Sequence, residues 1–298
     1  MHADAAAKDD LLPGFERRRF TTAGAEINAA VGGEGPPLLL LHGNPLTHVS
    51  WHQVAPALAE RYTVVAPDLR GYGDSSKPEG GGDHSDYSFR AMAEDNFEVM
   101  RQLGFERFPV AGHDRGARVT HRLLLDHGAR VDKAAVLDVA PTLDMYERTD
   151  RTFAEAYYHW FFLIQPFDLP ERMIGADPDF YLDKKIGLWS KVGGCFTPEA
   201  LAEYKRCFGD PATIHATCED YRAAATIDLR HDRADRARKI EPPLLVLWGQ
   251  QGVIERCYDV LELWSERAEE VSGRPLPCGH FLAEEAPAET LEALLAFL

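Results

Sequence analysis

Short apolar runs recur along the chain, each bounded by Gly, Pro or Asp, as is typical of strands buried on both faces of a parallel sheet. Segments of helical periodicity separate most of them, for example residues 89–104 and 117–128. This alternation predicts a mostly parallel central sheet flanked by helices. Residues 15–22 and 25–33 are expected to add an antiparallel pair at one edge. The predicted core strands cover residues 36–43, 62–68, 108–114, 134–141 and 242–249.

The alternation stops after Pro141 and resumes at about Ile240. The residues between them are predicted to be helical and are dense in aromatic side chains, most of which core packing would explain. Because open α/β sheets bind ligands at the carboxyl ends of their strands, we interpret the insertion as a cap over that edge. The prediction is a core formed by residues 1–141 and 240–298, with a helical cap over residues 142–239 inserted after the sixth strand.

Charge and cysteine content narrow the possible functions. The 298 residues include 48 Asp and Glu against 32 Lys and Arg, which gives a net charge of −16. Such a chain repels nucleic acids and anionic membranes, so clustered arginines stand out as local anion sites. The five cysteines fit neither a metal site nor a disulfide framework, and no segment reads as a signal peptide or a membrane span. We therefore expect a cytoplasmic protein that binds no metal.

The segment "VAGHDRGARV" has the pattern of a nucleophile turn. Gly112 and Gly116 flank Asp114 between a predicted strand and a predicted helix, which is the setting in which a sharp turn exposes its central side chain. The glycines are needed where any Cβ would clash. A carboxylate at this position can displace a leaving group from saturated carbon and form an ester with the enzyme. Hydrolysis of that ester requires a base, an acid that orients the base, and donors for the oxyanion.

The remaining members of such a site follow from chain order. In α/β hydrolases the histidine comes last, and His280 lies in a loop after the final predicted strand. Asp138, at the end of the strand before the insertion, is the predicted orienting acid, because the strand after the insertion ends without Asp or Glu. The backbone N–H groups of Asn44 and Arg115 are the predicted oxyanion donors. His42 and His113 are interpreted as residues that brace the loops.

Taken together and in order, several segments carry a resemblance that none carries alone. From about Phe15 to the C-terminus the chain resembles the fluoroacetate dehalogenases, also called haloacetate dehalogenases, of the α/β-hydrolase fold. The matching segments are "THVSWHQVAPALAERYTVVAPDLRGYG", "AGHDRGARV", "AVLDVAPT", "YHWFFLIQP", "DPDFY", "CEDYRA" and "CGHFLAEEAP".

The resemblance implies roles for individual residues. It assigns the nucleophile to Asp114, the base to His280 and the orienting acid to Asp138, in agreement with the prediction from motif and chain order. It also implies that Arg115 and Arg118 bind the substrate carboxylate. Fluoride is a poor leaving group with a compact charge, so it needs several short hydrogen bonds as it departs. An imidazole, an indole and a phenol are donors suited to this task. The resemblance assigns the departing halide to His159, Trp160 and Tyr221.

One position departs from the family pattern and leaves the halogen open. Asn44 stands where fluoroacetate-active members typically carry Phe, so chloroacetate or bromoacetate could be the better substrate.

The expected function is hydrolytic dehalogenation of a small anionic haloacid without a cofactor, and the resemblance suggests a homodimer. The alternatives are an epoxide hydrolase, disfavoured by Arg115 beside the nucleophile, and a non-catalytic small-molecule receptor, disfavoured by the complete catalytic set.

Overall fold

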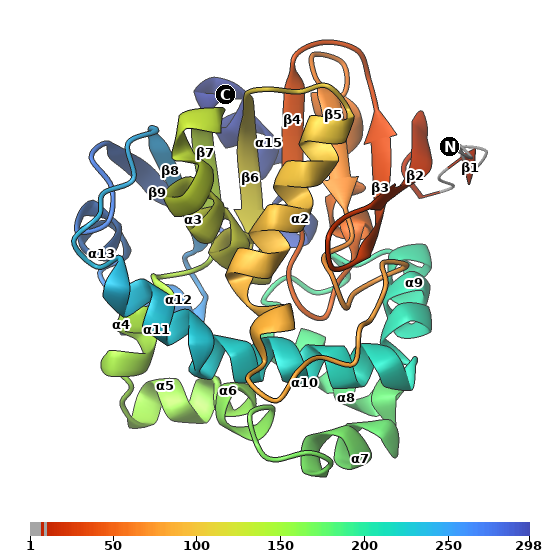
Figure 1. The fold of residues 1–298 in the computed structure, drawn as a ribbon, viewed down its shortest axis with the longest axis vertical. Coiled ribbons are helices and arrows are strands. Elements are labelled where there is room, and N and C mark those ends of the chain that lie inside the picture. Colours follow the sequence, from red (N-terminus) through yellow and green to blue (C-terminus); the bar gives the residue numbers. More distant parts are fainter. Residues whose placement is uncertain (1–6, 9–10) are drawn as a thin grey trace.

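The computed structural model describes residues 7–8 and 11–298, which form a nine-stranded sheet with helices on both faces (Figure 1). The strand order is β1-β2-β3-β5-β4-β6-β7-β8-β9, antiparallel from β1 to β5 and parallel from β5 to β9. The predicted, mostly parallel sheet is therefore confirmed. The strands are β1 (Ala7–Lys8), β2 (Phe15–Thr21), β3 (Glu26–Gly32), β4 (Pro37–Leu41), β5 (Thr63–Pro67), β6 (Phe108–His113), β7 (Val131–Leu137), β8 (Leu244–Gly249) and β9 (Val271–Leu276).

Helices cover the sheet and also form a separate layer below it in Figure 1. Helices α2 and α3 lie on one face and α15 on the other, and the helices between β7 and β8 lie beyond the carboxyl ends of the parallel strands (Figure 1). The helices that flank the sheet or its loops are α1 (Ala55–Leu58), α2 (Phe89–Gln102), α3 (Arg115–His127), α12 (Val253–Cys257), α13 (Val260–Ser265), α14 (Leu282–Glu285) and α15 (Pro287–Phe297), with 3-10 turns η1 (His48–Trp51), η2 (Ser85–Tyr87) and η3 (Gly128–Arg130).

The insertion is helical throughout its regular elements, as the sequence predicts. Helix α10 begins at Pro211 behind an Asp210 side chain that accepts a hydrogen bond from the backbone, and α8 begins in the same way at Pro178 behind Asp177. The description of residues 142–239 as a domain of their own stays a prediction. The helices of the insertion are α4 (Thr142–Glu147), α5 (Arg151–Ala156), α6 (Tyr158–Phe162), α7 (Leu169–Gly175), α8 (Pro178–Trp189), α9 (Pro198–Phe208), α10 (Pro211–Ala225) and α11 (Ile227–Ala234).

Two predictions differ from the structure here: where the strand before the insertion ends, and which strand the insertion follows. The sequence predicts a strand over residues 134–141, whereas β7 ends at Leu137. The reason is Asp138, whose φ of 55° takes the backbone out of the extended conformation. The insertion also follows the seventh strand instead of the sixth, because the short strand β1 precedes the predicted edge pair.

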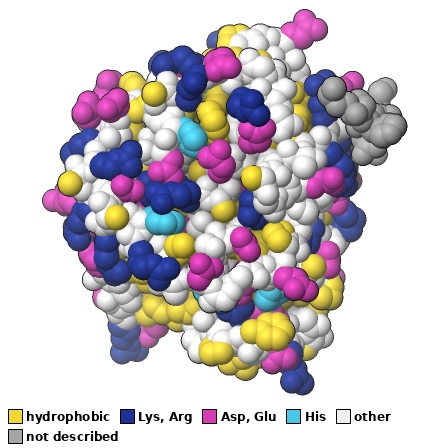
Figure 2. All heavy atoms as spheres, in the orientation of Figure 1, with side chains coloured by type: hydrophobic (Ala, Val, Ile, Leu, Met, Phe, Trp, Pro, Cys, Tyr) yellow, Lys and Arg dark blue, Asp and Glu magenta, His cyan; other side chains and the backbone are white. Residues whose placement is uncertain are grey.

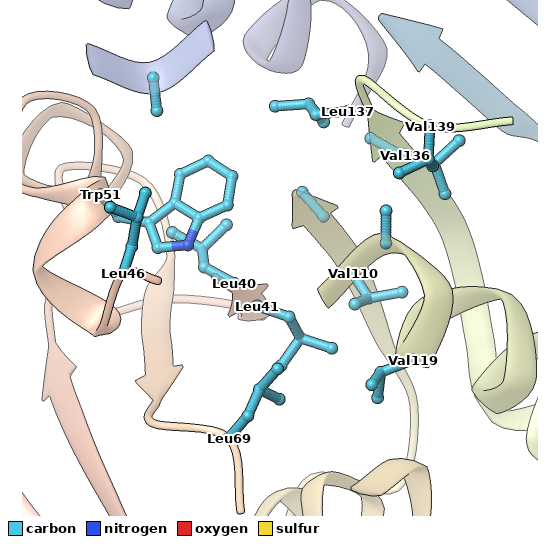
Figure 3. Packing of buried hydrophobic residues seen from close by; sticks show 14 of the residues in the cluster. Leu40, Leu41, Leu46, Trp51, Leu69, Val110, Val119, Val136, Leu137 and Val139 are labelled. Atoms are coloured by element: carbon cyan, nitrogen blue, oxygen red, sulfur yellow. The ribbon is translucent and has the colours of Figure 1, made fainter. Parts of the chain in front are cut away.

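The core lies between the sheet and its covering helices. Figure 3 shows Leu40 and Leu41 of β4 near Val110 of β6 and Val119 of α3, and all four side chains are fully buried. Continuous apolar strands of this kind need both faces covered, which α3 and the opposite helices provide. On the visible face in Figure 2, acidic and basic side chains are interspersed. Among the described residues, no helix combines the length and apolarity needed to cross a bilayer.

The parallel register brings the ends of the central strands to one edge. Leu41 of β4 pairs with Gly112 of β6, and His113 of β6 pairs with Leu137 of β7. Leu137 pairs in turn with Leu247 of β8. The loops that follow these strands carry Asn44, Asp114 and Asp138, and the loop after β9 carries His280.

Candidate active site

Asp114 occupies a strained turn between β6 and α3. Its φ of 47° and ψ of −110° are rare for a residue with a side chain, and the conformation aims the carboxylate away from the strand. A Cβ on Gly112 would lie 2.4 Å from the Gly116 carbonyl oxygen, and one on Gly116 would lie 2.4 Å from that of Leu41. Only glycine fits at either position, so the sequence motif matches a real steric requirement.

The Asp114 carboxylate is buried and faces two different groups. Oδ1 accepts a hydrogen bond of 2.9 Å from the Asn44 backbone N–H, and Oδ2 lies 3.8 Å from Nε2 of His280. Burial alone would raise the pKa of Asp114, but His280, His113, Arg118 and Arg115 together lower it to about 2. The carboxylate is therefore ionised at neutral pH, as a nucleophile must be.

His280 is held by Asp138. The two side chains are joined by a contact of 2.6 Å between Nδ1 and Oδ2, and Oδ1 of Asp138 accepts a 2.9 Å hydrogen bond from the Gly249 N–H. Burial raises the pKa of Asp138 despite its contact with His280. Nε2 of His280 has no hydrogen-bond partner within the described residues and points toward Asp114. This order of acid, imidazole and nucleophile suits a base that activates water beside Asp114.

The two histidines predicted to brace the loops, His42 and His113, contact backbone atoms. Nε2 of His42 accepts from the Leu69 N–H at 3.0 Å, and Nδ1 lies 2.9 Å from the Gly43 carbonyl oxygen. Nε2 of His113 lies 2.7 Å from the carbonyl oxygen of His280. Burial and His280 lower the pKa of His113 to about 3, so its ring is neutral and donates this bond. The His113 ring therefore links the end of β6 to the loop that carries His280, and the His42 ring links the loop after β4 to the loop after β5.

The two arginines differ in how much of each guanidinium is free. Arg115 donates from Nε to Oδ2 of Asp220 at 2.8 Å and from Nη2 to Oδ1, which leaves Nη1 without a hydrogen-bond partner in the described part of the chain. Arg118 donates from Nη1 to the oxygens of Ala140 and Thr142, at 3.2 and 3.0 Å, and its Nε is without a partner there. The assignment of both residues to a substrate carboxylate stays a prediction, and for Arg115 it can involve only Nη1.

The three residues assigned to the halide are all buried. The rings of His159 and Tyr221 lie 5.5 Å apart between centroids, and Trp160 lies under the Arg118 guanidinium at 4.8 Å. Burial, followed by the charge of Lys185, lowers the pKa of His159 well below its usual value. The three side chains are therefore a neutral imidazole, an indole and a phenol, and their assignment to the halide stays a prediction.

Two charged residues of the site were not found from the sequence. Asp220, the partner of Arg115, lies inside the segment "CEDYRA" that supports the resemblance, but its pairing depends on how the insertion packs on the core. Lys185 is buried on α8, where it donates from Nζ to Oδ1 of Asn44. A signal for Lys185 does exist. It shares the buried side of α8 with Leu182, Ile186 and Trp189, so a cation interrupts an apolar stripe of helical spacing.

The fold and this geometry define an α/β hydrolase that carries an aspartate, Asp114, in the turn between β6 and α3. The sequence pattern described as the alpha/beta hydrolase fold matches residues 36–287. A fluoroacetate dehalogenase from Burkholderia sp is 48% identical over 97% of this chain and 95% of its own. A soluble epoxide hydrolase from Corynebacterium sp. (strain C12) is 34% identical over 92% of this chain and 94% of its own.

A solved structure is similar to this chain over nearly its whole length. A protein from Nostoc sp PCC 7120, described as a candidate alpha/beta hydrolase, superposes with a TM-score of 0.94 at 61% identity, covering 95% of this chain and 97% of its own. The chain therefore belongs to the fluoroacetate dehalogenase family of the α/β-hydrolase fold.

Proposed function

We propose that this protein is a hydrolase that cleaves the carbon–halogen bond of haloacetates and short 2-haloacids. The observation that carries the proposal is the ionised Asp114 carboxylate. One of its oxygens accepts a hydrogen bond from the Asn44 N–H, the other faces His280, and the nearby Arg118 lowers its pKa. An anionic substrate explains why guanidinium groups surround an anionic nucleophile. The relative from Burkholderia sp adds independent support.

In the first step Oδ2 of Asp114 attacks the α-carbon in line with the carbon–halogen bond. The new C–O bond forms as the C–halogen bond breaks, and the electron pair leaves with the halide toward His159, Trp160 and Tyr221. Arg115, through Nη1, and Arg118 hold the substrate carboxylate. The product of this step is an ester between the enzyme and the 2-hydroxyacid.

In the second step water hydrolyses the ester. His280, oriented by Asp138, takes a proton from water, and the hydroxide adds to the carbonyl carbon of Asp114. The negative charge that develops on Oδ1 is stabilised by the Asn44 N–H, already 2.9 Å from that oxygen. Collapse of the intermediate breaks the bond between the Asp114 carbonyl carbon and the ester oxygen, and the departing alkoxide takes the proton from His280 to leave as the 2-hydroxyacid, which is glycolate for a haloacetate. Asp114 then gives up the proton of the added hydroxyl group and returns to the carboxylate form.

The test is incubation with fluoroacetate, chloroacetate and bromoacetate, measuring halide release and intact mass. We expect His280→Gln to accumulate the ester and Asp114→Asn to release no halide. Full halide release by Asp114→Asn would sink the proposal. Comparing the three halogens also tests the consequence of Asn44 in place of Phe.

Epoxide hydrolysis is the second candidate, because the relative from Corynebacterium sp. carries that name and the site contains buried tyrosines. Asp114 contributes to the raised pKa values of Tyr157 and Tyr221, so both phenols are protonated and lie within its electrostatic reach. A neutral epoxide turned over faster than any haloacetate would favour this activity. The homodimer and the cytoplasmic location expected from the sequence stay predictions.

A further inference from the structure

A buried lysine lies beside the candidate nucleophile and has no part in the mechanism above. Lys185 is 4% exposed on α8 and donates from Nζ to Oδ1 of Asn44. Its Nζ lies 5.5 Å from the ring centroid of Tyr221, whose ring also carries the Arg115 guanidinium at 4.3 Å. A lysine without a carboxylate partner is rarely buried, so its position requires an explanation.

Lys185 connects to the nucleophile through one residue. The side chain of Asn44 accepts from Lys185, while its backbone N–H donates to Oδ1 of Asp114 at 2.9 Å. Its Nδ2 lies 3.4 Å from the hydroxyl of Tyr72, which donates to Asp220 at 2.5 Å. A buried hydrogen-bonded chain therefore runs from the lysine past the nucleophile to the carboxylate that holds Arg115.

The charges of the site balance only if Lys185 is counted. Three buried carboxylates, Asp114, Asp138 and Asp220, share the site with Arg115 and Arg118. With Lys185 protonated, its charge and those of the two arginines match the three carboxylates, so an entering haloacetate adds a negative charge that these residues do not match. Elements packed around Lys185 present these titratable or charged groups to it: Asp114, Arg115, His159, Cys218, Asp220 and Tyr221.

We propose that Lys185 is a third cationic residue of the site, which holds Asn44 beside the nucleophile and offsets the charge of the entering substrate. This inference rests on the proposed function, because it requires an anionic substrate. Lys185 is a positioning and charge-balancing residue, and the bonds that form and break are those already described.

The proposal has a consequence that depends on pH. Burial lowers the pKa of Lys185 to about 7, against the opposing influence of Asp114. An anion bound nearby favours the protonated amine and raises this pKa again. At about pH 8 the free site is therefore mostly deprotonated at Lys185, and anion binding takes up a proton. At about pH 6 the amine is already protonated and no uptake is expected from it.

The test uses acetate as an unreactive probe, with calorimetry in buffers of different ionisation enthalpy to count protons. For the wild type we expect uptake approaching one proton at about pH 8 and little at about pH 6. Lys185→Met should bind acetate roughly tenfold or more weakly at the lower pH, with the uptake lost. Lys185→Arg should keep the binding and lose the uptake, since its charge does not titrate. The matched control is Lys184→Met, at the exposed neighbouring position.

One result would overturn the inference, and another concerns the function itself. If Lys185→Met binds acetate with wild-type affinity and wild-type uptake, Lys185 has no such role. If Lys185→Arg fails to fold, the comparison of the wild type with Lys185→Met still decides. Absence of halide release by the wild type with every haloacetate would instead refute the proposed function.

Discussion

Replacing Lys185 by Met should stabilise the protein at neutral and mildly acidic pH. Burial lowers the pKa of this amine from 10.5 to about 7, so keeping it charged in the folded state costs free energy. At ~1.4 kcal/mol for each pH unit, the cost is at most about 5 kcal/mol. Removing Lys185 also leaves Oδ1 of Asn44 without its donor, which costs ~1–3 kcal/mol. The net gain expected at about pH 6 is therefore roughly 2–4 kcal/mol.

The sign of this effect changes with pH. Between about pH 7 and pH 10.5 the unfolded chain keeps a proton on Lys185 that the folded protein has lost, so the wild type gains stability as pH rises. The advantage of Lys185→Met should shrink through this window and reverse at its upper end, where only the lost hydrogen bond remains. Urea unfolding followed by circular dichroism across the window measures the difference, with Lys184→Met as the control. A difference that does not change with pH would refute the reasoning.

Three further predictions concern the surroundings of the site. Glu285 accepts from the Gly279 and Phe281 N–H groups, both at 2.9 Å, so Glu285→Gln should lower the free energy of unfolding by ~1–3 kcal/mol and lengthen the lifetime of the ester. Intact mass measured over time follows the ester, and an unchanged lifetime would contradict a role in placing the base. Asp220→Asn should cost about 3 kcal/mol, because it leaves Arg115 buried without its counter-charge. Urea unfolding measures this cost, and a loss well under about 1 kcal/mol would contradict it. The net charge of −16 repels an anionic substrate, and salt screens this repulsion. We therefore expect kcat/KM for chloroacetate to increase when the ionic strength is raised from about 0.01 M to about 0.15 M with a salt that contains no halide. Initial rates measure it, and a steady fall with salt would show that the surface does not repel the substrate.

The sequence was most informative where local geometry decides the structure. The spacing of Gly112, Asp114 and Gly116 predicts a turn that only glycine at its flanks allows, and the structure contains that turn. The prediction was less accurate at the end of β7. Val139 and Ala140 continue the apolar run, and both are buried, but Asp138 has already turned the chain out of the strand.

Pairings across the insertion could not be predicted from the sequence. Arg115 and Asp220 lie far apart in the chain, and their contact depends on where the insertion places α10. The contact between Lys185 and Asn44 depends in the same way on α8. Residue type and spacing indicate that a charge is present, but they do not indicate its partner when a whole helical layer intervenes.

The two arginines near the nucleophile differ in their influence on the pKa of Asp114. Arg115 follows Asp114 directly, yet the influence of Arg118 on the pKa of Asp114 is the larger of the two. The two arginines also differ in their partners: Asp220 holds two nitrogens of Arg115, whereas Arg118 donates only to neutral oxygen and sulfur atoms. Two buried cations without counter-charges would stabilise the Asp114 carboxylate so strongly that its attack would slow. Pairing one of them with Asp220 limits this effect and leaves Nη1 of Arg115 available to a second anion.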